Sequence, residues 1–314
     1  MSDNAPHIPV MLDEVIEHLN PQDGDVIVDC TFGAGGYTRA LLTASNCRVI
    51  AIDRDPNVMG HVNAIENDFG NERFNFALTD FSEISNVIQR AGLNSVDGIV
   101  ADLGVSSMQL DDTHRGFSFL RNAPLDMRMD SDHSDTAEDL VNSMPVAELR
   151  HLIGHYGEER YAGRIATAID RARMDARITH TVQLADIIRD AVPAQYKNGA
   201  LHPATRTFQA IRIAVNDELG HIERLLGQIP SLLGSGGRFV CVSFHSLEDG
   251  LVKQALRSGY APDSSGSRYL PEIEKEAFTP IWSKISKKPL QPTENECENN
   301  NRARSSRLRW AVRS

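Results

Sequence analysis

The stretch V26-I-V-D-C-T-F-G-A-G-G36 decides the fold class, because a short apolar strand runs directly into a turn that carries Gly33, Gly35 and Gly36. Glycine-rich turns of this kind often bind phosphate, since bare backbone N–H groups and a following helix N-terminus attract anions. Here, however, Asp29 stands at the start of the turn. The ligand of the turn therefore has to be identified from other residues.

Buried strands are predicted wherever a short continuous apolar run occurs in the first third of the chain, at residues 25–29, 48–53, 74–79 and 96–102. A helical pattern separates the first two. Such an alternation is typical of a parallel sheet that is covered on both faces, so this part is α/β. A further apolar strand follows the glycines at 236–237 and ends at Ser243, and residues 306–313 alternate as an edge strand would.

The tract between these parts is predicted to be entirely helical, with helices at 135–144, 146–156, 158–174 and 182–192. Ser134 or Asp135 with Glu138 resembles a capping box at the start of the first. From His202 to Leu226 the spacing predicts one long helix or two abutting ones. We therefore expect a Rossmann-like domain at 1–104 and 216–314, and an inserted helical domain at 105–215 that recognises the substrate.

The composition indicates an ordinary globular protein, with 314 residues and a formal charge of -11. The four cysteines are widely separated and form no CxxC pair, which predicts neither disulfides nor a metal site. No basic leader or membrane-length apolar run occurs, so we expect a cytoplasmic protein with no membrane contact. Residues 284–314 carry eight Lys or Arg against three Glu, which suits either a polyanion ligand or a solvated tail.

Four aspartates lie at or just beyond the carboxyl ends of the four predicted strands: Asp29, Asp53, Asp80 and Asp102. The carboxyl ends of parallel strands form the ligand-binding edge of an open sheet. Carboxylates there repel a pyrophosphate and attract hydroxyls, ammonium groups and a sulfonium. The dinucleotide-binding fingerprint GxGxxG does not match either, because its last Gly would fall on residue 38, which is Thr. No Walker motif is present. These patterns favour S-adenosylmethionine as the cofactor.

Roles follow from the order of these residues. The three glycines would let the backbone approach the methionine part, and Asp29 either orients its ammonium group or caps the turn. Asp53, about 20 residues beyond the glycines, is placed for the ribose hydroxyls. Asp80 either lies near adenine or caps the helix at Phe81, and Phe81 either contacts adenine or belongs to the core.

Asp102 opens D102-L-G-V-S-S107 at the end of the fourth strand, where we expect the transferable methyl group. A carboxylate there can accept hydrogens from an exocyclic amine and so assist N-methylation. His245, at the end of the fifth strand, contacts the base or a phosphate, or is structural. The pair in H151-L-I-G-H155 has metal spacing without the zincin Glu, and we interpret it as surface.

Nine motifs together closely resemble the bacterial ribosomal RNA small subunit methyltransferase H family, nearly from end to end. They are T31-F-G-A-G-G36, A51-I-D-R-D-P56, D102-L-G-V-S-S107, R115-G-F-S-F119, P124-L-D-M-R-M129, Y156-G-E-E-R160, H202-P-A-T-R-T-F-Q-A-I-R-I-A-V-N216, S243-F-H-S-L-E-D249 and R302-A-R-S-S-R-L-R309. The resemblance implies N4-methylation of a cytidine in the decoding centre of 16S ribosomal RNA. It also implies cofactor contacts at Gly35, Gly36, Tyr37, Asp53, Phe81, Asp102 and Gln109, of which Tyr37 and Gln109 come from the family alone.

An RNA substrate needs cations for its phosphates and an aromatic ring for the flipped base. The RNA-binding residues that we predict are Arg160, Arg164, Arg206, Arg212, Arg302 and Arg304. The alternative is a solvated helical face. No Pro-Pro-aromatic follows Asp102, so Phe117, Phe119 and Phe244 are candidates for stacking, or core residues.

Three other functions share parts of this pattern. A small-molecule methyltransferase would use the insertion as a lid but would not explain the Arg-rich tail. A cofactor sensor would need Asp102 only structurally. A nicotinamide dehydrogenase is disfavoured by Thr38 and the acidic edge. Two pairs of alternatives stay open: the RNA is naked or part of the small subunit, and either water or Asp102 accepts the proton.

Overall fold

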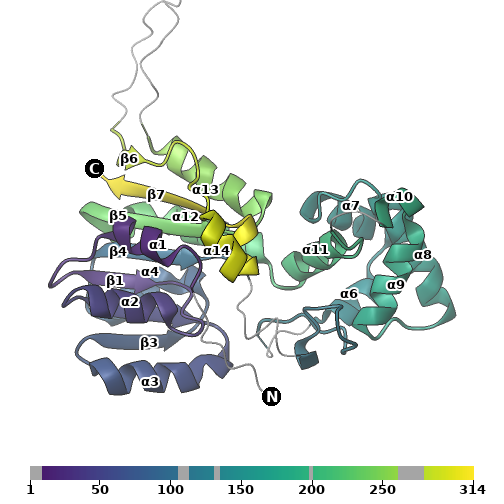
Figure 1. The fold of residues 1–314 in the computed structure, drawn as a ribbon, viewed down its shortest axis with the longest axis horizontal. Helices are drawn as coiled ribbons and strands as arrows, with labels where there is room; N and C mark the ends of the chain where they lie inside the picture. Colours follow the sequence, from purple (N-terminus) through teal and green to yellow (C-terminus); the bar gives the residue numbers. More distant parts are fainter. Residues whose placement is uncertain (1–8, 105–112, 131–134, 198–200, 261–278) are drawn as a thin grey trace, which may run out of the picture. The chain divides into compact units, whose positions relative to one another are not determined.

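The computed structural model describes residues 9–104, 113–130, 135–197, 201–260 and 279–314, and the chain divides into two compact units (Figure 1). The first unit comprises Met1–Gly104 and Gly220–Ser314, and the second comprises Val105–Leu219.

In the described residues of the first unit, seven strands form one sheet in the order β3-β2-β1-β4-β5-β7-β6. The strands are β1 (Val26–Asp29), β2 (Arg48–Asp53), β3 (Phe74–Leu78), β4 (Val96–Asp102), β5 (Leu233–Ser243), β6 (Trp282–Ile285) and β7 (Arg307–Arg313). All neighbours from β3 to β5 pair in parallel, whereas β7 runs antiparallel to both β5 and β6. The predicted α/β sheet is confirmed.

The prediction that the last strand lies at the edge of the sheet is wrong. β6 pairs with its outer side, with Ile285 opposite Ala311. β6 has only four residues, and only Trp282 among them is buried, so its sequence pattern is too short to identify a strand. Arg309 of β7 is buried, and its guanidinium group pairs with the Asp249 carboxylate at 2.6 Å.

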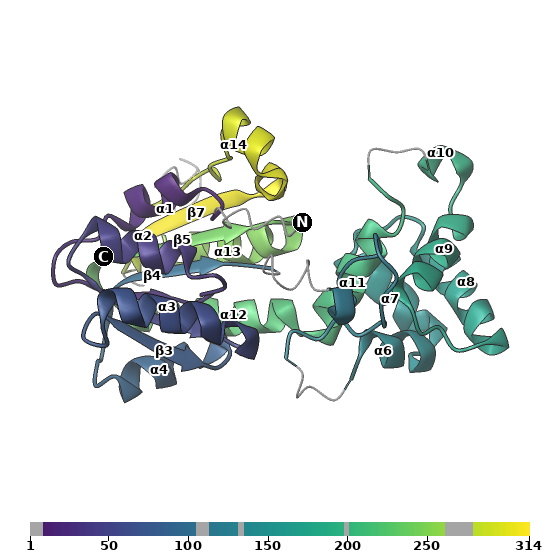
Figure 2. The ribbon, with the colours of Figure 1, turned by 60° about the horizontal axis from the view of Figure 1, so that its bottom comes forward.

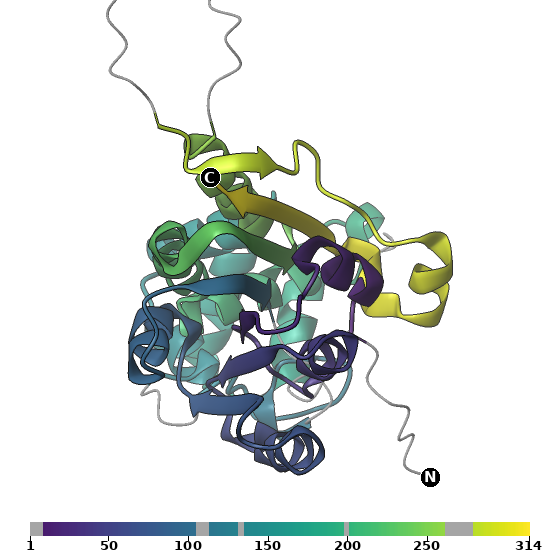
Figure 3. The ribbon, with the colours of Figure 1, turned by 90° about the vertical axis from the view of Figure 1, so that its left-hand side faces the viewer.

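Helices cover both faces of the sheet (Figure 3). One face carries α1 (Leu12–Leu19), α2 (Gly36–Ala44) and α3 (Met59–Phe69), and the other carries α4 (Ile84–Arg90), α12 (Glu218–Leu232) and α13 (Ser246–Ser258). Central strand residues such as Ile99 and Phe239 are fully buried between these layers. Shorter helices are η1 (Pro56–Val58), η2 (Phe81–Glu83), α14 (Glu294–Asn299) and η4 (Asn301–Ser305).

The second unit is helical (Figure 2). It has an apolar core of its own. Its described elements are η3 (Thr113–Arg115), α6 (Ala137–Ser143), α7 (Val146–Tyr156), α8 (Ala162–Asp175), α9 (Thr181–Ala191), α10 (Ala194–Lys197) and α11 (Thr205–Val215). α7 packs against both α8 and α11, and α8 packs against α9. Fully buried Leu149, Ile165 and Ile211 hold these helices together.

Two helix starts differ from their predictions. α6 is capped by Thr136, whose Oγ1 accepts the Asp139 N–H at 3.1 Å, so the capping box lies one residue beyond the predicted Asp135 and Glu138. Ser134 lies outside the described residues. α8 begins at Ala162 instead of residue 158, because Glu158 has a φ of 48°, a left-handed conformation that cannot start a helix.

The alternatives for the segment after His202 are also decided. α11 and α12 are two helices, because Asp217 between them has a φ of 45°. Among the described residues, no helix is long and apolar enough to cross a membrane.

Candidate functional site

The strand order reverses between β1 and β4, because β2 and β3 extend to one side of β1 whereas β4 and β5 extend to the other. Ligands of open α/β sheets bind at the carboxyl ends of the strands at such a point. β1 ends at Asp29 and β4 ends at Asp102, and Asp29 pairs in register with Val100. The predicted aspartates therefore stand at the switch point.

Asp29 is fully buried, and both of its carboxylate oxygens are used within the turn. Oδ2 accepts the Thr38 hydroxyl at 2.7 Å, and Oδ1 accepts the Thr31 N–H at 3.1 Å. Burial raises the pKa of Asp29 to about 6, although these hydrogen bonds oppose that rise. Of the two predicted roles, the geometry corresponds to the cap of the turn.

The three glycines of the turn serve different purposes. Gly33 and Gly35 have φ angles of 53° and 78°. A Cβ atom at Gly36 would lie 2.2 Å from Cγ of Pro9, and one at Gly35 would lie 3.0 Å from the Phe32 ring. At Gly33 the nearest atom to such a Cβ would be a backbone oxygen 4.0 Å away. Gly33 therefore presents the open face of the turn, whereas packing explains the other two.

Asp53, at the end of β2, binds the glycine turn directly. Its Oδ2 accepts the Gly33 N–H at 2.8 Å, and its Oδ1 accepts the Asp55 N–H at 2.9 Å. Burial raises the pKa of Asp53, while these two backbone hydrogen bonds lower it. Each carboxylate oxygen has a second lone pair, so Asp53 can still accept hydroxyl donors such as those of a ribose.

Asp80 caps η2 and also pairs with a residue that the sequence reasoning missed. Oδ1 accepts the Ser82 N–H at 2.8 Å, and it lies 2.6 Å from Nδ1 of His221 on α12. Burial alone would raise the pKa of Asp80, but hydrogen bonds from His221 and Ser82 outweigh it and lower the pKa to about 2. Phe81 stands edge-on to the His221 ring at 6.2 Å and is only half-buried, so it is not a core residue.

The two cofactor contacts that came from the family alone have different outcomes. Tyr37 is buried, and its hydroxyl donates to the Val10 carbonyl, so the phenol is already occupied within the protein. Burial raises the pKa of this phenol well above its ordinary value. Gln109 lies outside the described residues.

Asp102 has an unusual environment for a carboxylate. Its N–H donates to the Thr31 hydroxyl at 2.7 Å, but its Oδ1 atom is buried and has no hydrogen-bond partner within the described part of the chain. Burial, together with the nearby carboxylates of Asp29 and Glu248, raises the pKa of Asp102 well above its ordinary value. A buried acceptor without a donor is costly, which points to a donor supplied by a ligand.

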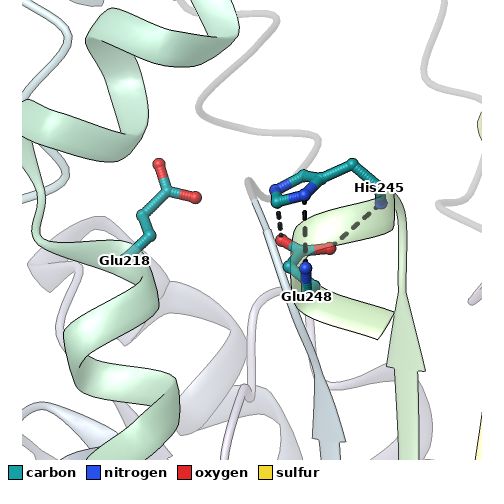
Figure 4. Close-up of side chains that lie close together, drawn as sticks. All are labelled: Glu218, His245 and Glu248. Atoms are coloured by element: carbon teal, nitrogen blue, oxygen red, sulfur yellow. Dashed lines mark hydrogen bonds and ion pairs between the residues drawn. The ribbon is translucent and has the colours of Figure 1, made fainter. Parts of the chain in front are cut away.

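His245 is the N-cap of α13, and Figure 4 shows how it packs on Glu248. Its Nδ1 accepts the Glu248 N–H at 3.4 Å, and its Nε2 lies 3.0 Å from Oε1 of Glu248. The other Glu248 oxygen accepts the Phe244 N–H at 2.7 Å. The ring therefore has a structural role as a cap, and its contact with a substrate stays a prediction.

Glu248 itself was missed, although the spacing in H245-S-L-E248 is that of a capping box and could have identified it. It is fully buried, and a Cβ on Gly104 would lie 3.7 Å from it and 3.5 Å from Phe244. Phe244 is half-buried at this place and remains a candidate for stacking. In the helical unit, Phe117 is buried and Phe119 packs on Phe208 at 4.9 Å, which is typical of core residues.

The predicted RNA-binding arginines fall into two groups. Arg160, Arg164, Arg206 and Arg304 are exposed, although Arg206 donates to the Glu158 carbonyl at 2.8 Å, and Arg302 is half-buried. Arg212 forms two 2.8 Å hydrogen bonds with Glu218, the third residue drawn in Figure 4, inside the helical unit. Arg212 therefore forms an ion pair within the helical unit.

The reversed β7, the switch point between β1 and β4 and the carboxylates around the glycine turn define the class as a Rossmann-like S-adenosylmethionine-dependent methyltransferase. Within that class, the chain belongs to the MraW methylase family, whose model matches residues 4–314. Its cofactor is accordingly S-adenosylmethionine.

Several relatives are similar over nearly the whole chain. The ribosomal RNA small subunit methyltransferase H of Caulobacter vibrioides strain NA1000 is 49% identical over 312 residues, which cover 99% of this chain and 96% of the relative. That of Paramagnetospirillum magneticum is 45% identical and covers 98% and 96%. A solved rRNA methylase from Streptococcus thermophilus aligns with a TM-score of 0.42 at 10% identity, over 96% of this chain and 93% of the other.

Proposed function

We propose that this protein transfers a methyl group from S-adenosylmethionine to N4 of a cytidine in the decoding centre, the P site, of 16S ribosomal RNA. The names of the relatives support a ribosomal RNA substrate in the small subunit. The motif resemblance supports cytidine N4 as the acceptor. Such a substrate would place the enzyme in the bacterial cytoplasm with the assembling small subunit as its partner.

The proposal that the methyl acceptor is an amine rests on one observation, the unpartnered Oδ1 atom of Asp102. The lone pair of an exocyclic amine is delocalised into the ring, so the amine is a poor nucleophile. An acceptor that bonds one of its hydrogens helps the nitrogen to pyramidalise and lowers the cost of the developing positive charge. Asp102 would satisfy its own buried oxygen by the same contact.

The residues around the turn suit the cofactor. When bound, S-adenosylmethionine supplies an electrophilic methyl group. The open face at Gly33 suits the close approach of its amino acid part, because no side chain occupies that space. Asp53 retains acceptor capacity for ribose hydroxyls, and half-buried Phe81 offers a ring beside the adenine.

The RNA backbone would be held by arginines of the helical unit and the tail, which are exposed except for half-buried Arg302. Arg160, Arg164, Arg206, Arg302 and Arg304 remain in this proposal. Arg212 is less suited to it, because phosphate would have to compete with the Glu218 carboxylate at 2.8 Å. An Arg212→Gln variant should therefore lose stability in the helical unit more than RNA affinity.

The test is methyl transfer from labelled S-adenosylmethionine to small subunits that lack the modification, followed by nucleoside analysis. We expect the label in N4-methylcytidine alone. Label in another nucleoside would overturn the assignment, and transfer only to a small molecule would support the lid interpretation of the insertion. Cofactor binding by wild-type protein without any transfer would support a sensor.

A further inference from the structure

A hollow of about 710 Å³ opens between α7 and α8 of the helical unit. Small residues make the room for it: Ala147 and Gly154 come from α7, and Ala162 and Gly163 come from α8. A Cβ on Gly154 would lie 3.6 Å from the Ala162 methyl group. Larger side chains at these places would fill the space between the helices.

Two arginines stand at this hollow without an acidic partner. In the described part of the chain, no carboxylate lies within ion-pair distance of Arg150 or Arg160. Arg150 reaches from α7 across to Gly163, where an added Cβ would lie 3.5 Å from its Nε atom. Arg160 lies over the Tyr161 and Tyr196 rings at 4.7 and 5.0 Å, which restricts its guanidinium group.

The lining has one acid, Glu159, against the two arginines, so it keeps a net positive charge. Glu159 is buried, with one oxygen accepting the Tyr161 N–H at 2.8 Å and the other accepting the Tyr196 hydroxyl at 2.6 Å. The charge of this hollow is positive, whereas the formal charge of the whole chain is -11. It therefore suits an anionic ligand.

Stacked imidazoles complete the lining. His151 and His155 lie one helical turn apart on α7, with ring centroids 5.6 Å apart and planes inclined by 21°. Both side chains are exposed. Aromatic faces beside arginines are the arrangement by which proteins bind single-stranded nucleic acid, because each base has a face that can stack.

We infer that this hollow is a nucleotide subsite for the RNA strand that carries the target, in which Arg150 and Arg160 bind backbone phosphates and His151 and His155 stack on a base. The inference rests on the proposed RNA substrate and gives a role to His151 and His155, which lack the Glu of the zincin metal motif. It concerns a nucleotide other than the one that is methylated, since Asp102 serves the target amine.

The test compares Arg150→Gln/Arg160→Gln with Arg90→Gln/Arg257→Gln, a control that removes the same charge. Arg90 and Arg257 are exposed near the C-terminal ends of α4 and α13, away from the carboxyl ends of the strands. Binding to small subunits that lack the modification is measured over a KCl series at fixed Mg²⁺. Each lost phosphate contact lowers the slope of log K against log salt by about 0.7, so we expect a slope about 1.4 shallower for the hollow variant only.

A second measurement locates the RNA. Ultraviolet crosslinking of wild-type protein to the same subunits, followed by mass spectrometry, should give RNA-modified peptides from residues 147–163. The His151→Ala/His155→Ala variant should lose these crosslinks while keeping its affinity for S-adenosylmethionine. Equal salt slopes in the two double variants, or no wild-type crosslinks in this segment, would overturn the inference. If wild-type protein methylates no ribosomal RNA, the proposed function itself fails, which the labelling experiment detects separately.

Discussion

The carboxylate of Asp53 accepts the backbone N–H of Gly33 at 2.8 Å, so the end of β2 holds the turn that follows β1. The same carboxylate accepts the Asp55 N–H and thereby also fixes the start of the next loop. One charged side chain thus orients the open face of the glycine turn and remains available to hydroxyl donors. The shape of the proposed cofactor site depends on this pair before any ligand binds.

Replacing Asp53 by Ala should weaken S-adenosylmethionine binding at least tenfold, measured by isothermal titration calorimetry. The substitution leaves the Gly33 and Asp55 N–H groups without their acceptor, and hydrogen bonds to charged groups contribute about 1.5–3 kcal/mol each. Asp53→Asn keeps one acceptor oxygen and should lose less affinity. Asp68→Asn removes an exposed partner of Arg39 and should change nothing. An Asp53→Ala protein with wild-type affinity would remove this pair from the cofactor site.

Alanine at Gly33 and at Gly36 should separate ligand contact from packing. Gly33→Ala adds a Cβ to the open face at a φ of 53°, so we expect reduced cofactor affinity with a stability loss of about 1–2 kcal/mol. Gly36→Ala places its Cβ 2.2 Å from Cγ of Pro9 and should mainly lower the free energy of unfolding, by about 1–3 kcal/mol. Pro9→Ala removes that Cγ and should partly restore the Gly36→Ala protein. Urea unfolding and calorimetry measure the two effects, and the absence of restoration would contradict the packing explanation.

The Asp80–His221 pair should make the free energy of unfolding depend on pH in the acid range. The pKa of Asp80 is lowered to about 2 in the folded chain, from its ordinary value of 3.8, so the folded state binds fewer protons between these values. Its contribution of roughly 2 kcal/mol is present above pH 4 and is lost as the pH falls toward 2. Asp80→Asn should be less stable at pH 7 and should lack this part of the acid transition in urea unfolding. Parallel pH curves for the two proteins would contradict the assignment.

The sequence is sufficient for the parts of the fold that depend on local pattern. Continuous apolar runs predict β2 and β4 with their observed bounds, and the helical spacing predicts α7 from Val146 to Tyr156. Asp53 was identified because its distance from the glycines is characteristic of this class of sheet. β6 was missed, because four residues with one buried side chain carry too little pattern.

The parts of the site that were missed depend on contacts between distant segments. His221 reaches Asp80 only because α12 packs beside η2, which no local pattern encodes. The buried phenol of Tyr37 depends in the same way on Val10. The unpartnered oxygen of Asp102 is a property of burial, and therefore it becomes visible only when the strands are assembled.

The buried carboxylate of Asp102 should lower the free energy of unfolding and should be needed for methyl transfer. Its folded pKa is raised above the unfolded value, so the folded state binds more protons and the free energy of unfolding falls as pH rises above about 4. Asp102→Asn removes the buried charge at nearly the same volume, and the cofactor-free variant should be more stable than wild type, by more at pH 8 than at pH 5. Methyl transfer should fall at least about 100-fold, the usual contribution of a positioned proton acceptor.

Urea unfolding at both pH values and the labelled-cofactor assay measure these effects, with Asp68→Asn as the control. A variant that keeps full transfer would make Asp102 purely structural, and one that is destabilised more at pH 8 would contradict the direction of the pKa shift.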